Sequence, residues 1–119
     1  MFKIYENDIA LTRGDTLETN VEIIKDGEVY TPTAGDVVRF SVKRKEFTND
    51  GYDFVDQVPL IDIEIPSDMV LVVEPQHTEF LGFGVYHYDI DITMEDGYKS
   101  TFVSGDLIIL PKSDERLIK

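Results

Sequence analysis

Apolar and polar residues alternate with a period of two along much of this chain. In 38–42, for example, Val38, Phe40 and Val42 alternate with Arg39 and Ser41. Such alternation points one set of side chains into a core and the other toward solvent, as in a half-buried β-strand. Alternation or a β-branched run predicts strands at 10–12, 17–23, 29–30, 38–42, 61–65, 69–73, 86–94 and 101–110.

Turn-forming residues separate these predicted strands. Asp26-Gly27 predicts a tight hairpin turn, since both residues readily adopt positive φ, and 49–53 reads as a polar loop tip. One short helical turn is predicted within 74–81, where Pro75 suits the first helical position. The pattern indicates an all-β fold, an antiparallel β-sandwich of about seven strands over residues 1–111, followed by a charged tail at 112–119.

The segment 84–92 makes the fold prediction more specific. Gly84 and Tyr86 precede strict alternation, which is how a strand begins at the tyrosine corner of an immunoglobulin-like sandwich. In that corner the tyrosine hydroxyl turns back to the backbone of the preceding loop. Tyr88 stands two residues later, where antibody domains carry a cysteine. We therefore predict an immunoglobulin-like sandwich with Tyr86 and Gly84 at its corner.

The net charge of the chain limits the kinds of partner that it can bind. The 119 residues include 24 acidic and 11 basic residues, for a net charge of −13. This charge repels phosphate backbones, so no nucleic acid is expected as a partner. The acids favour solubility; the open alternatives are a basic protein partner or bound divalent cations.

Several classes of protein are excluded by composition. There is no cysteine, which rules out disulfides and thiolate metal sites and fits a protein made in a reducing cytoplasm. No stretch approaches the roughly 18 apolar residues of a membrane span, and residues 1–8 carry charges where a signal peptide needs an apolar run. We expect no membrane insertion and synthesis in the cytoplasm.

Two short motifs have simple structural explanations. Arg13-Gly14-Asp15 matches the tripeptide of integrin ligands, but so short a match is common by chance. We expect a glycine bend in which Asp15 bonds to the local backbone. Lys43-Arg44-Lys45 is predicted to keep a strand end soluble and to discourage edge pairing; the alternative is contact with an acidic patch on another copy.

Histidine and carboxylate residues on one strand face resemble a reactive cluster. His87, Asp89 and Asp91 alternate with apolar residues, and successive residues on one strand face lie close together. We interpret them as the solvated side of a strand, because a metal site normally needs three or four convergent ligands. Calcium held by Asp89, Asp91 and loop acids is the alternative. No nucleophile elbow or phosphate-binding loop occurs, so neither an enzyme, a cofactor nor a metal is predicted.

Four segments together resemble a known family: 9–17, 35–43, 74–81 and 84–90. They are similar to the small immunoglobulin-like structural proteins of phages and prophages of Gram-positive bacteria, and to the N-terminal domain of phage baseplate upper proteins. The resemblance spans Ile9 to about Leu110, and the chain stops after the sandwich, without the long helix or receptor-binding module of the baseplate form. The resemblance implies a non-enzymatic virion structural or assembly protein, an accessory of the tail, baseplate or head fibre. Such a protein is made in the cytoplasm of the bacterial host and is part of the virion after assembly.

A sandwich can join such an assembly through its edges. Exposed edge strands carry unpaired backbone groups that a neighbouring subunit can extend by strand addition. We predict docking to other virion proteins or self-association through the first or the last strand. The candidate residues are Ala10, Leu11, Thr12, Phe102, Val103 and Leu107.

Two other functions stay open at this stage. One is a host-surface or carbohydrate-binding module, which would gather exposed aromatic rings at a loop end; the candidates are Tyr52, Phe54 and Tyr98. The other is an enzyme that uses an acidic cluster, which requires a concave pocket with several convergent carboxylates of raised pKa.

Overall fold

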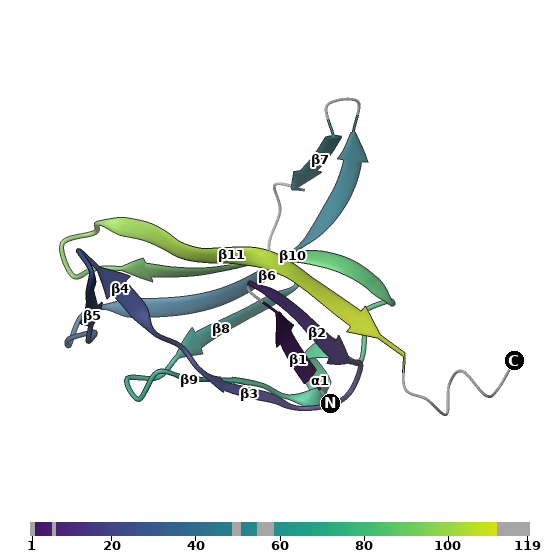
Figure 1. Cartoon of the computed structure of the whole chain (residues 1–119), viewed down its shortest axis with the longest axis horizontal. Coiled ribbons are helices and arrows are strands. Elements are labelled where there is room, and N and C mark those ends of the chain that lie inside the picture. Colours follow the sequence, from purple (N-terminus) through teal and green to yellow (C-terminus); the bar gives the residue numbers. More distant parts are fainter. Residues whose placement is uncertain (1, 6, 49–50, 55–58, 112–119) are drawn as a thin grey trace, which may run out of the picture.

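The protein folds into two layers of β-strands around one apolar core (Figure 1). The computed structural model describes the backbone of residues 2–5, 7–48, 51–54 and 59–111, and the side chains of 7–45 and 59–111. Its elements are β1 (Phe2–Tyr5), β2 (Asp8–Thr12), β3 (Leu17–Asn20), β4 (Ile23–Lys25), β5 (Glu28–Tyr30), β6 (Val37–Thr48), β7 (Gly51–Phe54), β8 (Ile61–Ile65), β9 (Val70–Val73), α1 (Pro75–Thr78), β10 (Gly84–Thr93) and β11 (Lys99–Leu110).

The first layer is a seven-stranded sheet built on three long strands. Its order is β1-β2-β11-β10-β6-β7, and β8 also pairs with β6. The two short strands share one edge of β6, since β8 pairs with 38–42 and β7 with 45–48. The β7 end of β6 projects away from the two layers in Figure 1. A smaller β4–β5 hairpin lies beside the far end of the long strands.

The second layer is the antiparallel pair β3–β9, which lies along one side of the large sheet (Figure 1). Period-two alternation explains the core between the layers, because every second residue of the facing strands is buried. Leu17, Leu71 and Val73 come from the small layer, and Phe40 and Leu107 from the large one. The all-β sandwich predicted from the pattern is confirmed.

The details of the strands differ from the prediction in three ways. The sheet is mixed, because β2 runs parallel to β11 while the other pairs are antiparallel. The described residues hold eleven strand segments rather than about seven, since 17–23 divides into β3 and β4 and since β1 was not predicted. The polar loop expected at 49–53 is wrong in part, because β7 begins at Gly51 and pairs with β6. The predicted helical turn is confirmed at α1, with Pro75 at its start.

Candidate functional site

Tyr86 ties the start of β10 to the loop before it. Its hydroxyl donates a hydrogen bond to the carbonyl oxygen of Gly82 at 2.8 Å. Gly84 lies between the two with a φ of 142°, a region that side chains disfavour and glycine tolerates. Tyr88, two residues on, is buried in the core against Phe40, with ring centroids 5.5 Å apart. The corner therefore fixes the position of β10, and with it the side chains that alternate along it.

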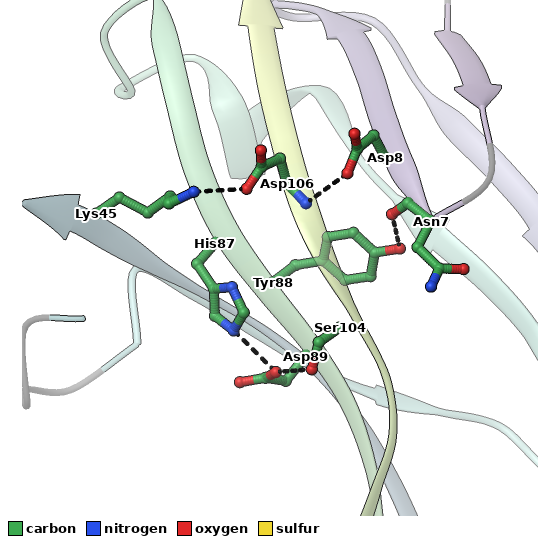
Figure 2. A network of polar contacts seen from close by, with 8 residues as sticks. All are labelled: Asn7, Asp8, Lys45, His87, Tyr88, Asp89, Ser104 and Asp106. Carbon is green, nitrogen blue, oxygen red and sulfur yellow. Dashed lines mark hydrogen bonds and ion pairs between the residues drawn. The ribbon is translucent and has the colours of Figure 1, made fainter. Parts of the chain in front are cut away.

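A polar network covers part of the outer side of β10 and β11 (Figure 2). The Oδ1 atom of Asp89 lies 2.9 Å from Nε2 of His87 and also accepts a 2.6 Å hydrogen bond from the Ser104 hydroxyl. A nucleophilic serine needs a base positioned to take its proton, usually a histidine that a carboxylate orients from its far side. Here the Asp89 carboxylate lies between Ser104 and His87. The order of the three groups therefore differs from that of a catalytic triad, in which the histidine contacts the serine.

Asp91, the third member of the predicted polar face, lies further along β10. Burial raises the pKa of the Asp91 carboxyl, as do the charges of Asp89 and Asp62, whereas Lys99 and Arg39 lower it. Among the residues whose side chains the structure describes, no three histidine or carboxylate groups converge as metal ligands. On this face, Asp89 contacts both His87 and Ser104, and Asp91 lies apart from that contact.

A second set of contacts joins the interior of β11 to β6 and to the turn before β2 (Figure 2). The Asp106 carboxylate pairs with Lys45 Nζ at 2.8 Å, while the Asp106 backbone N–H donates to Asp8 Oδ1 at 3.1 Å. The hydroxyl of Tyr88 donates to the carbonyl oxygen of Asn7. The turn before β2 is thereby held over the edge of β11. Lys45, from the predicted basic cluster, is engaged within its own chain.

Beyond this turn β11 has a long unpaired edge. β2 pairs with β11 only at 107–110, whereas β10 pairs with it along nearly its whole length. Among the strands that the structure describes, none pairs with 99–105 on the side opposite β10. We call this stretch the free edge of β11. It contains Phe102 and Val103, two of the predicted interface residues.

Three of the other four predicted edge residues do not lie on an edge. Ala10 and Leu11 pair with β1 on one side and with β11 on the other, because β1 folds back as a hairpin over β2. Thr12 pairs with Leu110. Leu107 is buried and pairs with both Tyr86 and Ile9. The prediction of an exposed edge is wrong for Ala10, Leu11 and Leu107, since neighbouring strands take up their backbone groups on both sides. Thr12 pairs on one side only among the described strands, so its place on an edge stays a prediction.

An apolar groove of about 260 Å³ opens beside the free edge. It lies between the β4–β5 hairpin and the β10–β11 hairpin, and its apolar lining comes from Ile23, Ile24, Ile92, Met94, Tyr98 and Phe102. Two lining residues are widely exposed, Ile24 at 58% and Tyr98 at 61%. Exposed apolar side chains gathered at a concave surface are typical of a contact site.

The segments that flank this groove are acidic. Residues 22–28 and 95–99 carry five carboxylates and two lysines, all on exposed residues. The carboxylates are Glu22, Asp26, Glu28, Glu95 and Asp96, and the lysines are Lys25 and Lys99. The Nζ atom of Lys25 lies 5.5 Å from the ring centre of Tyr30, so this lysine is already turned to its own chain. The groove therefore has a mainly apolar lining that also includes Lys25, Asp26 and Ser100, and the segments around it carry a net negative charge.

The predicted ring surface for sugars is not formed as proposed. Tyr98 follows the end of β10 that pairs with Val37, whereas β7 pairs with 45–48 at the opposite end of β6. Tyr52 and Phe54 belong to β7, and their side chains lie outside the described residues. The backbone nevertheless places β7 and Tyr98 at different ends of the sheet, so the three candidates do not share one loop end.

The Arg13-Gly14-Asp15 motif is held in a bend against α1. The Gly14 N–H donates to Oγ1 of the buried Thr78 at 2.9 Å, and the Asp15 N–H donates to the Thr12 carbonyl at 3.0 Å. The Arg13 guanidinium lies 4.5 Å from the centre of the Phe83 ring, within the range of a cation–π contact. The motif thus has structural contacts along its length.

Sequence reasoning missed the groove. Its signal is the pair Ile23-Ile24, since two successive apolar residues in a strand point to opposite faces and only one of them reaches the core. Ile23 is buried and Ile24 is exposed.

A search of protein-family models, curated proteins and solved structures found no match to this chain. Within the described residues, no helix is long and apolar enough to span a membrane.

Proposed function

We propose that this chain is a non-enzymatic structural or assembly protein of a phage or prophage particle, an accessory of the tail, baseplate or head fibre that acts through contacts with other proteins. The observation that carries the proposal is the free edge of β11 beside an apolar groove. Unpaired backbone groups and exposed apolar side chains at one place are the two ingredients of strand addition by a partner.

The assignment to a particle is supported by the resemblance of segments 9–17, 35–43, 74–81 and 84–90 to the phage immunoglobulin-like proteins. The expected partners are other virion proteins or further copies of the chain. A rigid sandwich suits this work, because its core holds the edges and loops in fixed positions for neighbouring subunits.

A structural role is also supported by the polar network on β10 and β11. Asp89 accepts the Ser104 hydroxyl and lies beside His87, an arrangement that links β10 to β11 through side-chain hydrogen bonds. The carbohydrate-binding alternative is supported less well, because Tyr98 and β7 lie at opposite ends of β6. Protein contact is therefore the function that the surface favours.

The direct test is to look for the chain in particles. Particles released from the cells that encode the chain are purified on a density gradient, washed in salt and treated with nuclease, and the chain is detected by antiserum and mass spectrometry. We expect it to co-sediment with the particles at a constant ratio to the major structural proteins. Recovery of the chain only from the soluble cell fraction would contradict the assignment.

A further inference from the structure

We propose that the groove beside the free edge of β11 binds an extended, basic segment of another protein, which adds to β11 as a further strand. The inference rests on the proposed function in that it takes the chain to act through protein contacts, and it names the surface and the chemistry of the partner. Three properties of the surface lead to it: open backbone groups, exposed apolar side chains and a negative rim.

The backbone of the free edge is oriented to accept a strand. The Asp106 N–H points away from β10, because it donates to Asp8 on the opposite side. In an antiparallel ladder, the backbone N–H groups of every second residue point to the same side of the strand. The Ser104 N–H, two residues before Asp106, therefore also points away from β10. The turn at Asn7 and Asp8 closes one end of this edge, and the β10–β11 hairpin closes the other. The open stretch 99–105 is about as long as a typical strand, roughly five to seven residues. It contains a β-bulge at Phe102, where the register with β10 shifts between Ile90 and Asp91, so an added strand pairs on either side of that residue.

The groove takes up side chains of the added strand. Ser100 and Phe102 of β11 line it, so it lies directly beside the open backbone. Every second residue of an added strand points to the same face, which brings alternate side chains over Ile24 and Tyr98. Both residues are more than half exposed in the free chain and lose water contact when the strand adds.

Charge selects the kind of partner. Five carboxylates against two lysines lie in the segments that flank the groove, Asp26 and Lys25 among them lining it, and the chain as a whole carries −13. A basic segment is drawn toward this surface, whereas a second copy of the chain is repelled. The occupant is therefore a basic, alternating segment of a different protein rather than the same edge of another copy.

The test uses a yeast-displayed library of random twelve-residue peptides, sorted for binding to the full chain at physiological salt. We expect the selected peptides to be enriched in Lys and Arg that alternate with β-branched or aromatic residues, and to lose binding when a central residue is replaced by proline. Backbone amide shifts on peptide binding should fall on 23–26 and 98–105. Failure to enrich any binder, or enrichment of acidic or proline-rich peptides, would overturn the proposal.

Variants of the chain locate the site. Ile24 and Val29 are cross-strand partners in the hairpin with similar exposure, 58% and 60%, but only Ile24 lines the groove. Ile24→Thr should weaken the selected peptides about tenfold by loss of apolar contact, while Val29→Thr leaves the affinity within about twofold. Both substitutions keep a β-branched residue, so the hairpin is preserved. Equal effects of the two would overturn the proposal.

Ser104→Pro tests the backbone contacts, because it removes an outward N–H at an edge position where proline is tolerated. It should reduce binding at least tenfold relative to Ser104→Ala, which also loses the hydroxyl bond to Asp89 but keeps the backbone N–H. Should this variant fail to fold, Tyr98→Ser at the exposed turn serves instead, with the same expected loss. A concentration-dependent dimer through 99–105, or a glycan that shifts the same amides in place of peptides, would overturn the choice of occupant.

The experiments distinguish failure of the proposed function from failure of the proposed binding site. Peptide binding at the groove by a chain that is absent from particles contradicts the proposed function and supports the groove. A chain that is found in particles while its selected peptides bind elsewhere supports the function and overturns the groove.

Discussion

Gly105 of β11 lies against the carbonyl of Asn7, with no room for a side chain between them. A β-carbon at position 105 would lie 2.1 Å from the Asn7 carbonyl oxygen and 3.1 Å from a ring carbon of Tyr88. This close approach lets the Tyr88 hydroxyl reach the same Asn7 oxygen. The glycine therefore decides how closely the turn before β2 seats on β11, and so where the free edge begins.

Gly105→Ala should push this turn away and break the Tyr88–Asn7 hydrogen bond. We expect the free energy of unfolding to fall by about 2–4 kcal/mol, from overpacking and the lost bond together, measured by urea denaturation. Gly82→Ala is the matched control, since a β-carbon there meets its nearest atom, the Tyr86 hydroxyl oxygen, at 3.8 Å. Equal stability of the two variants would show that the turn does not depend on the glycine.

Ionisation of Tyr88 is expected to lower the stability of the protein at alkaline pH. Burial, with a contribution from the Asp8 charge, raises the pKa of Tyr88 to about 12, whereas an unfolded tyrosine titrates near 10. The folded chain holds this proton more tightly than the unfolded chain, so its stabilising effect is complete below about pH 10 and is lost as the pH rises toward 12.

Tyr88→Phe should remove this alkaline component. At neutral pH the variant loses the hydrogen bond to Asn7, at a cost of about 0.5–1.5 kcal/mol. Its melting temperature should then fall less steeply than that of the native chain between about pH 10 and pH 12. Parallel melting curves of the two proteins across that window would contradict the linkage to Tyr88.

The hydroxyl of Tyr86 is expected to stabilise the corner by a modest amount. Tyr86→Phe removes the 2.8 Å hydrogen bond to Gly82 and should cost about 0.5–1.5 kcal/mol in the free energy of unfolding. Tyr98→Phe, on a ring that is 61% exposed, should change it by less than about 0.5 kcal/mol. If both hydroxyls matter equally, the corner contact has no special role in holding β10.

The sequence reveals the corner and the core but not the order of strands. Alternation around Phe40 and Tyr88 is local, and it predicts which residues face inward without any knowledge of their neighbours. The hairpin of β1 over Ala10 and the short parallel contact of β2 with β11 depend on residues far apart in the chain. Pairing of that kind leaves little local signal, which is why the predicted edge at Ala10 is wrong.

The free edge and the groove beside it also depend on residues that are far apart in the sequence. A glycine inside a strand, as at Gly105, signals close approach of another backbone, but the approaching residue, Asn7, is 98 positions away. The free edge exists because β2 is much shorter than β11, and the pattern of each strand taken alone does not tell how much of the other it covers. Only Ile24 beside Ile23 carries a local sign of the surface.

Thr78 is expected to hold the Arg13-Gly14-Asp15 bend against α1. It is fully buried and accepts the Gly14 N–H at 2.9 Å. Thr78→Val keeps the shape but leaves that N–H without its acceptor, which should cost about 1–3 kcal/mol. Hydrogen exchange of the Gly14 amide should become faster in Thr78→Val and stay slow in Thr78→Ser, which retains the hydroxyl. Unchanged exchange in the valine variant would show that the amide is protected by other means.

Self-repulsion should make the stability of the chain depend on salt. A net charge of −13 destabilises the compact state, and ions screen that repulsion. We expect the melting temperature to rise by a few degrees between about 20 and about 200 mM NaCl, over which the screening length shortens severalfold. The combined variant Glu22→Gln, Glu28→Gln and Glu95→Gln neutralises three exposed carboxylates, from −13 to −10, and should show a smaller rise. A flat response of the native chain would mean that its carboxylates are already paired or hold cations, and the negative rim proposed to attract a basic partner would then be neutralised.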